Sequence, residues 1–301
     1  MLSLIFIVIC AAISPGLLNR TRSILSGRKG PKLLQAIYNL ALLSRKGAVY
    51  SSASGFVFRA APTVSLAAII VAMLMVPFGK FNSLISFPCD FVLFAYLFAV
   101  SRFAMILGAL DTASSFEGMG ASREALYGML VEPAFFILAG TFAMISGYNS
   151  FEQIFGFFDP QNLASMIPGT LAAFTFFCMM LVETSRLPVD DPRTHLELTM
   201  IHEVMILDYC GFDLAAIQTA NYLKAAIYAV LASLCLLPYS MNFAFYSPLF
   251  IFVVLLSPVI TGIFESFRAR NRLQRNPSYI LTITAMAFVA FLTAAIQNME
   301  H

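Results

Sequence analysis

The feature that most limits the fold of this chain is a series of long apolar stretches that recurs along the sequence. Each approaches the roughly 20 residues that an α-helix needs to cross a hydrocarbon layer about 30 Å thick. Of the 301 residues, 59% are hydrophobic and 11% are charged, whereas a soluble domain carries about 25% charged residues. A soluble fold could not bury so much apolar surface. The sequence therefore predicts an integral membrane protein and argues against a soluble enzyme.

Eight of these stretches are long enough to span a membrane as helices. They lack the alternation of apolar and polar residues that is typical of barrel strands. The first has no basic segment before it and no A-x-A-like cleavage site after it, which favours a retained helix over a signal peptide. The predicted fold class is all-α: one polytopic membrane helix bundle, residues 1–301, with about eight transmembrane helices and structured cytoplasmic loops. The predicted spans are Leu2–Leu18, Ala61–Phe78, Phe91–Leu110, Leu130–Gly147, Leu163–Val182, Tyr222–Pro238, Pro248–Phe264 and Tyr279–Ile296.

The basic residues are distributed unevenly between the two sets of loops. Fifteen Lys and Arg residues lie in the loops after the first, third, fifth and seventh spans, and only Lys80 lies in the other loops. By the positive-inside rule, the basic loops face the cytoplasm, and an even number of spans then places both termini in the periplasm. We therefore expect a multi-pass protein of the cytoplasmic (inner) membrane. Its cytoplasmic loops are predicted near residues 19–60, 111–129, 183–221 and 265–278.

The first cytoplasmic loop carries apolar residues at helical spacing, from Leu33 through Ile37 and Leu40 to Ala41. This pattern predicts an amphipathic helix at the membrane surface. Its apolar face could anchor the loop in lipid or dock a partner protein, and the pattern leaves both interpretations open.

Several ionisable residues lie inside the predicted spans or at their ends, where each costs about 2.5–3.5 kcal/mol on insertion scales. Arg102 lies within the third span, Asp111 ends it, Glu132 opens the fourth and Glu183 closes the fifth. One interpretation is a proton relay from the cytoplasmic face into the bundle. The alternative is that Glu and Arg form static pairs or lie at the interface. The candidate relay residues are Asp111, Glu117, Glu132, Glu183, Glu197 and Glu203.

The pattern of cysteines and histidines argues against a metal site in this chain. The five cysteines are scattered singly, so no C-x-x-C pair exists to hold zinc or an iron–sulfur cluster. His202-Glu203 begins like a zinc-protease motif, but Ile206 occupies the position of its second histidine. The segment His195–Tyr209 is instead predicted to form a short amphipathic helix over the cytoplasmic end of the bundle. We expect no cofactor in this chain.

Three motifs follow one another on the predicted cytoplasmic loops. They are Gly27-Arg28-Lys29-Gly30-Pro31, the stretch from Ser115-Phe116-Glu117 to Arg123-Glu124-Ala125, and Glu183-Thr184-Ser185-Arg186-Leu187-Pro188-Val189-Asp190. Together they resemble the respiratory complex I subunit 1 family, over nearly the whole chain and in the same order. The doubled Asp190-Asp191-Pro192 is more similar to the hydrogenase branch of this family than to its quinone-reducing branch.

This resemblance implies a helix bundle that anchors a peripheral redox arm. The implied partners are hydrogenase large and small subunits, an iron–sulfur protein, antiporter-like membrane subunits and, in a formate-dependent complex, formate dehydrogenase. The [NiFe] centre and the iron–sulfur clusters would lie in those partners. Membrane lipid is an expected contact and nucleic acid is not. The residues predicted to dock the arm are Arg28, Lys29, Arg123, Glu124, Arg186, Asp190, Asp191, His195 and His202.

Three hypotheses for the function follow. The leading hypothesis is the membrane-anchor and ion-coupling subunit of a hydrogen-evolving group 4 [NiFe] hydrogenase or formate hydrogenlyase-type complex, which moves protons or Na⁺. The second is the quinone-chamber subunit of a complex I-type NADH or ferredoxin:quinone oxidoreductase. The third is an independent secondary transporter, for which an internal repeat would be expected and none is evident.

Overall fold

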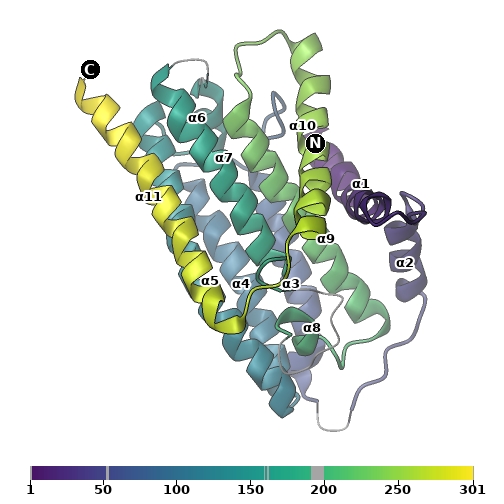
Figure 1. The fold of residues 1–301 in the computed structure, drawn as a ribbon. Helices are drawn as coiled ribbons and strands as arrows, with labels where there is room; N and C mark the ends of the chain where they lie inside the picture. Colours follow the sequence, from purple (N-terminus) through teal and green to yellow (C-terminus); the bar gives the residue numbers. More distant parts are fainter. Residues whose placement is uncertain (1, 52–53, 159, 161–162, 191–199, 301) are drawn as a thin grey trace.

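The fold is taken from a computed structural model that describes residues 2–51, 54–158, 160, 163–190 and 200–300. Over these residues the chain is built from helices and connecting segments, and its only β contact is an isolated bridge between Phe78 and Phe81 (Figure 1). The predicted all-α fold class is confirmed.

Eight helices of the described chain are long and apolar enough to cross a membrane, which confirms the predicted number. The chain is therefore a multi-pass membrane protein. These helices are α1 (Leu2–Leu25), α3 (Phe56–Met75), α4 (Asp90–Asp111), α5 (Ser115–Ser146), α7 (Leu163–Glu183), α9 (Gly211–Leu236), α10 (Phe243–Phe267) and α11 (Asn276–Glu300). Between them lie the short helices α2 (Gln35–Ser44), α6 (Phe151–Phe157), α8 (His202–Met205) and the 3₁₀ turn η1 (Leu273–Arg275).

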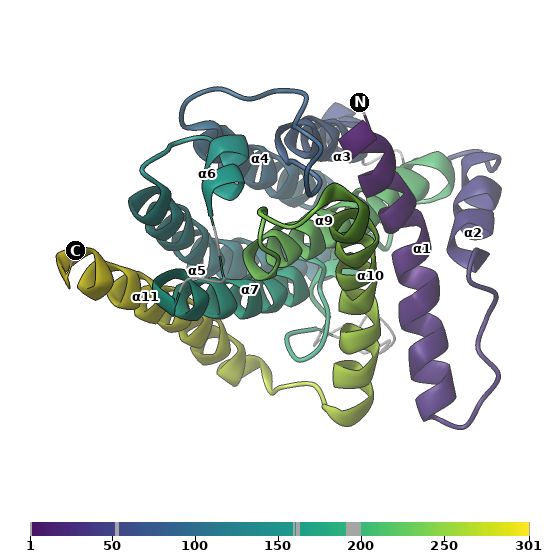
Figure 2. The same ribbon diagram turned by 90° about the horizontal axis from the view of Figure 1, so that it is seen from above.

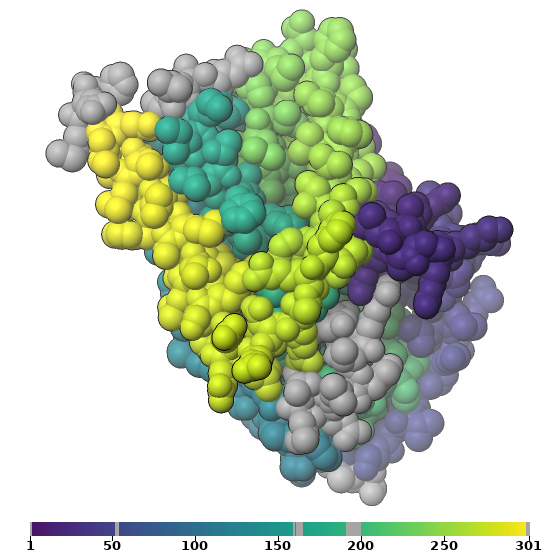
Figure 3. Space-filling model, in the orientation of Figure 1, coloured from purple at the N-terminus to yellow at the C-terminus, as the bar shows by residue number. Residues whose placement is uncertain are grey.

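Helices α7 and α9 form the centre of the bundle. Their most apolar 18-residue windows are 67% buried, against 28% for those of α10 and α11. Helix α11 lies along α5 and α7 on one flank, and α1 and α2 lie on the opposite flank beside α9 and α10 (Figures 1 and 2). The space-filling view shows α11 covering the first flank and α1 standing out on the other (Figure 3).

The central position of α9 explains its composition. Its most apolar 18-residue window has a mean hydropathy of 1.3, the lowest of the eight spans, and the helix as a whole carries Asp213, Gln218, Asn221 and Lys224 among its apolar residues. Polar side chains in a membrane-spanning helix are tolerated where neighbouring helices shield them from lipid. Helix α9 therefore brings polar groups to the middle of the bundle.

Several helices extend beyond the spans that the apolar pattern predicts. Helix α5 begins at Ser115, whereas the apolar pattern places the start of this span near Leu130. The additional turns pack against the segment around α8, because Gly120 lies directly against Ile201 and Met205. Tertiary packing thus makes residues 115–129 helical, within the segment that the charge distribution predicts to be the structured cytoplasmic loop 111–129.

The two predicted amphipathic helices differ in outcome. Helix α2 forms where it was predicted, and its apolar residues Leu34, Ile37 and Leu42 remain exposed at its start and along it, so anchoring and docking both stay open. In the segment His195–Tyr209, the described residues form only the four-residue helix α8, and residues 191–199 lie outside the described residues.

Candidate functional site

A buried ion network lies where α4, α5 and α7 meet. Its centre is Arg102 of α4, whose side chain is 7% exposed. The guanidinium donates one hydrogen bond to Glu132 Oε1 of α5, at 2.8 Å, and another to Glu183 Oε1 at the end of α7. Two carboxylates thus share one cation at a position where an isolated charge would be costly.

The absence of a side chain at residue 128 makes room for this network. A Cβ atom on Gly128 of α5 would overlap the guanidinium of Arg102. Beside Gly128 lies a cavity of about 10 Å³, roughly the space of one water molecule, lined by Glu124, Asp190 and the two network residues Arg102 and Glu183. Glu124 also interacts electrostatically with Arg102 and Glu183, so it belongs to the ion network.

Helix α9 brings a second cation to the network. Lys224 is 5% exposed and lies within electrostatic range of Glu183 and Glu124. Its positive charge also acts on His202 of α8. Burial, assisted by Lys224, lowers the pKa of His202 to about 4, so this imidazole is neutral near pH 7. The ring atom Nε2 of His202 lies 2.9 Å from Asn221 Nδ2, an arrangement in which the neutral ring accepts the amide hydrogen.

Asp190 ties three segments together at this end of the bundle. Its Oδ2 accepts hydrogen bonds from the backbone N–H groups of Ile201, at 3.1 Å, and His202, at 3.2 Å. Its Oδ1 lies 2.9 Å from Arg270 Nη2. From α5, Arg123 donates a 2.9 Å hydrogen bond to the carbonyl of Met200. The turn after α7, the segment that leads to α8 and the segment before α11 therefore form one polar unit.

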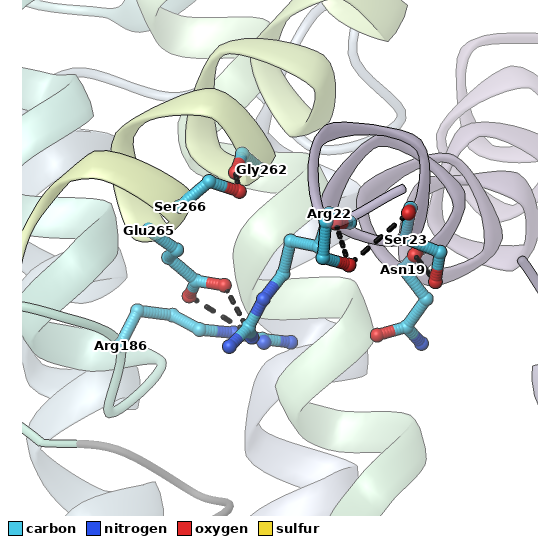
Figure 4. A network of polar contacts seen from close by, with 8 residues as sticks. Asn19, Arg22, Ser23, Arg186, Gly262, Glu265 and Ser266 are labelled. Carbon is cyan, nitrogen blue, oxygen red and sulfur yellow. Dashed lines mark hydrogen bonds and ion pairs between the residues drawn. The ribbon is translucent and has the colours of Figure 1, made fainter. Parts of the chain in front are cut away.

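A second ion cluster joins α1, α10 and the turn after α7. The carboxylate of Glu265, which is fully buried, lies 2.6 Å from Arg22 Nη1 and 3.7 Å from Arg186 Nη1. Figure 4 shows the two guanidinium groups converging on Glu265 from different elements. Gly262 allows α1 to approach α10 here, since a Cβ at this position would lie 3.0 Å from the carbonyl of Leu18.

A cavity of about 270 Å³ lies between α1, α7, α9 and α10, next to this cluster. Apolar residues such as Leu18, Ala226 and Val254 form much of its wall. Arg186, His202, Glu203 and Asn221 add polar groups. The cavity thus combines the dimensions and the chemistry of a site for a small amphiphilic molecule.

The outer surface of the bundle exposes part of the ion network. A groove of about 380 Å³ runs between α4 and α5, with Tyr96, Phe103 and Met129 on its walls and Arg102 and Glu132 among its lining residues. The side chain of Glu132 is 40% exposed there, whereas that of Glu183 is 4% exposed. The network therefore leads from the interior to a lateral face of the bundle.

The sequence pattern of the NADH dehydrogenase family matches residues 1–298. The chain belongs to this family. Formate hydrogenlyase subunit 4 of Escherichia coli strain K12 is 27% identical over 300 residues, which cover 96% of this chain and 97% of that protein. Hydrogenase-4 component C of the same strain is 30% identical over 229 residues, or 74% of this chain and 70% of that protein. An NADH-quinone oxidoreductase subunit of Rubrobacter xylanophilus is 27% identical over 215 residues, or 68% and 62% respectively.

A solved structure shares the fold of this NADH dehydrogenase family member. A chain of the membrane-bound sulfane sulfur reductase, an archaeal respiratory membrane complex, matches with a TM-score of 0.77 at 16% identity, covering 97% of each chain. The resemblance to the complex I subunit 1 family, and to its formate hydrogenlyase and hydrogenase members, is confirmed.

The structure brings some of the predicted relay residues together and leaves others apart. Glu132 and Glu183 share Arg102. Asp111 instead accepts hydrogen bonds from the backbone N–H groups of Gly55, at 2.8 Å, and Phe58, at 3.0 Å, and so caps the start of α3. Glu117 is buried and accepts a hydrogen bond from Thr112. Glu203 lines the 270 Å³ cavity, and Glu197 lies outside the described residues.

The predicted docking residues are also divided. Arg28 and Lys29 are exposed just beyond α1. Arg123, Arg186, Asp190 and His202 all make contacts within the chain, so they hold the polar unit and the second ion cluster in shape. Asp191 and His195 lie outside the described residues.

Sequence reasoning did not single out Glu265, its partner Arg22 or the buried Lys224 as site residues. Glu265 lies at the end of an apolar run, where an acidic residue is common, and its two partners are distant in sequence. Lys224 stands out in the sequence only as an isolated charge. In the described part of the chain, no group of three or more His, Cys, Asp or Glu residues is arranged to hold a metal ion.

Proposed function

We propose that this member of the NADH dehydrogenase family is the membrane-anchor and ion-coupling subunit of a hydrogen-evolving, formate hydrogenlyase-type complex. Its relatives include formate hydrogenlyase subunit 4 and hydrogenase-4 component C, which are parts of larger complexes by name. In this proposal, hydrogenase large and small subunits and an iron–sulfur protein hold the [NiFe] centre and the iron–sulfur clusters. An antiporter-like membrane subunit completes the ion path, and formate dehydrogenase joins in a formate-dependent complex.

The observation that carries the proposal is the arrangement of Glu183, Arg102 and Glu132. A carboxylate that shares a cation loses much of that attraction when it accepts a proton, so Arg102 then binds the other carboxylate more strongly. Glu183 lies inward, near Glu124 and Asp190, and Glu132 reaches the lateral groove. A change of charge in a docked redox arm would alter the proton affinity of the inner groups and pass a proton toward Glu132.

The lateral groove is the proposed contact for the antiporter-like subunit. Glu132 is 40% exposed at a depth where the predicted span places hydrocarbon. A carboxylate that faced lipid there would be costly, whereas a polar residue of a neighbouring subunit would stabilise it. The exposed Arg28 and Lys29, on the opposite flank, remain the proposed contacts for the soluble arm.

The test is to substitute Glu132 and Glu183 by Gln in the assembled complex. Gln keeps the size and hydrogen-bonding ability but removes the titratable proton. We expect both variants to assemble with their partners and to lose redox-linked proton movement into membrane vesicles, with hydrogen evolution slowed where the two processes are coupled. Glu152→Gln is the matched control, because Glu152 accepts a hydrogen bond from Ser83 Oγ, at 2.9 Å, near the other end of the bundle.

Two results would contradict the proposal. If E132Q and E183Q assemble and move protons as well as E152Q does, the carboxylates form a static pair. If the chain copurifies without hydrogenase subunits, its assignment to a hydrogen-evolving complex fails whatever these carboxylates do.

The second candidate function is that of a quinone-chamber subunit, and the 270 Å³ cavity favours it. Its apolar wall and its polar groups Arg186, His202 and Glu203 match a molecule with an apolar tail and a hydrogen-bonding ring. Quinone that copurifies with the complex, together with quinone-dependent electron transfer that is lost when Ala226 is enlarged to Phe, would support this alternative. Full hydrogen evolution after extraction of all quinone would exclude it as the required activity.

A further inference from the structure

An aromatic pocket lies at the end of the bundle where α1 and α10 begin and α3 ends. Its volume is about 210 Å³, and it is lined by Phe6 of α1, the turn after α3 and the first turns of α10. Phe6 stacks on Phe78 with ring centroids 5.3 Å apart, and Phe78 meets Phe250 edge to face at 4.9 Å. The pocket is therefore a rigid apolar space between two membrane-spanning helices, separate from the ion network.

The turn after α3 fixes one positive charge at this pocket. Phe78 and Phe81 exchange two backbone hydrogen bonds, of 3.1 and 3.0 Å, which close the turn around Gly79 and Lys80. Gly79 has a φ of 59°, a conformation that favours glycine, and a Cβ atom there would lie 2.8 Å from the ring of Tyr246. Lys80 is thus held in place by the backbone and not merely by its own flexible side chain.

Lys80 has no carboxylate partner among the ion pairs of the described residues. Its ammonium lies 5.1 Å from the ring of Tyr239 and 5.5 Å from that of Tyr246, and it donates a hydrogen bond to the carbonyl of Met241. These contacts hold the ammonium but leave its charge unneutralised. The sequence contains no other Lys or Arg in the loops at this side of the predicted topology.

The start of α10 adds further donors beside Lys80. Within the described chain its N-cap residue, Asn242, makes no side-chain hydrogen bond to the helix, and Met241, which binds Lys80, immediately precedes it. The first backbone N–H groups of a helix lack partners within the helix and carry a partial positive charge. Lys80 and Phe243, the first residue of α10, both line the pocket, so the ammonium and the helix start lie beside the same space, which suits an anion such as a phosphate group.

The apolar part of the site is open toward the surroundings of the bundle. Phe243 is 52% exposed and stands against Phe81, with ring centroids 5.6 Å apart, and Phe245 in the same turn is 72% exposed. Aromatic residues at helix ends are typical of the boundary between hydrocarbon and lipid headgroups. A ligand with a long apolar chain and an anionic head would satisfy the rings and the charge together.

We propose that this pocket binds an anionic phospholipid, with its phosphate between Lys80 and the start of α10 and one acyl chain in the aromatic pocket. An anionic lipid fits this site because its phosphate would pair with the isolated cation and its acyl chain would fill the apolar cavity. Basic groups between transmembrane helices recognise anionic lipid headgroups in this way. The lipid would join α1 to α10 at the end of the bundle opposite the Glu265 cluster.

The test uses the assembled complex in lipid nanodiscs that contain a phosphatidylglycerol or a phosphatidylcholine with a photoreactive acyl chain. After irradiation, labelled peptides are identified by mass spectrometry. We expect labelling of residues 78–81 and 243–251, with a preference of about fivefold for phosphatidylglycerol. Lys80→Gln should abolish the preference, and Lys80→Arg should retain it. Lys32→Gln, which changes an exposed lysine in the first predicted cytoplasmic loop, should leave the preference unchanged.

Three results would overturn the proposal. Equal labelling by both lipids would show that no anionic headgroup is recognised. If the photoreactive lipid labels a partner subunit and does not label residues 78–81 and 243–251, protein covers the pocket. Suppression of labelling by inorganic phosphate alone, at concentrations that leave the lipid intact, would show that a free anion occupies the site.

Discussion

Arg102 can reach Glu183 only because the facing residue of α5 is Gly128. We expect Gly128→Ala to displace the guanidinium, since the added Cβ would overlap it, and to leave Glu183 buried without its cation. An Ala in a helix would otherwise stabilise it by about 0.5–1 kcal/mol. The variant should therefore have a lower unfolding temperature as the purified chain, and less redox-linked proton movement in the assembled complex.

Gly140→Ala is the matched control for this prediction. Gly140 lies in the same helix, and nothing occupies the space of its Cβ atom. The control should leave the unfolding temperature unchanged or raise it slightly. Equal behaviour of the two variants would mean that Arg102 can relax away from α5 at no cost.

His202 makes a pH-dependent contribution to stability. Its pKa in the fold is about 4, below the value near 6.5 of an unfolded chain, so the unfolded state binds a proton more readily. The contribution is fully present above about pH 6.5 and is lost as the pH falls toward 4. We expect the unfolding temperature of the wild type to drop over this range more steeply than that of His202→Gln. Parallel curves would show that the pKa of His202 is the same in the folded and unfolded states.

Charged residues within or at the ends of apolar stretches are the site residues that the sequence predicts best. Arg102 interrupts one such stretch, and Glu132 and Glu183 lie at the ends of two others. Their common attachment to Arg102 depends on the relative rotation of three helices and on Gly128, which no spacing within one segment reveals. The cap function of Asp111 was missed for the same reason, because its two hydrogen-bond donors belong to another helix.

At the scale of elements, the cluster around Glu265 holds α1 against α10 and the turn after α7. Glu265→Gln would leave Arg22 and Arg186 facing each other without an anion. Breaking a buried ion pair typically costs about 3–5 kcal/mol, so we expect a clear loss of thermal stability and easier access of thiol reagents to Cys10 in the adjacent cavity. The double exchange R22E/E265R should recover only part of the loss, because it restores the pair between α1 and α10 but places the arginine introduced into α10 beside Arg186. If E265Q proves as stable as the wild type, packing at Gly262 alone joins the two helices.

Helix ends were less predictable than the helices themselves, for a physical reason. An apolar window detects the part of a helix that lies in hydrocarbon, whereas α5 continues beyond it because its first turns pack against Ile201 and Met205. In the described part of the His195–Tyr209 segment, backbone N–H groups bind Asp190 and only α8 is helical. The periodicity of the segment alone does not reveal that these N–H groups bind Asp190 in place of helix carbonyls.

At the scale of the whole molecule, the eight spans and the distribution of charge predict one topology. Reporters fused at Met1 and His301 should both signal from the periplasm, and reporters near Arg28 or Arg270 should signal from the cytoplasm, because fifteen basic residues lie in one set of loops and one in the other. Termini on opposite sides would require that one of the eight helices does not cross the membrane.

The low hydropathy of α9 has a consequence for how the chain enters the membrane during synthesis. A segment with Asp213, Gln218, Asn221 and Lys224 inserts into lipid unfavourably on its own. Apart from α10, the helices that surround it, namely α1, α2, α3 and α7, precede it in the chain. When α9 leaves the ribosome, its protein neighbours are already present, and it can pass from the translocation channel into a bundle instead of into lipid. The order of the helices in the sequence is thus also a workable order of assembly.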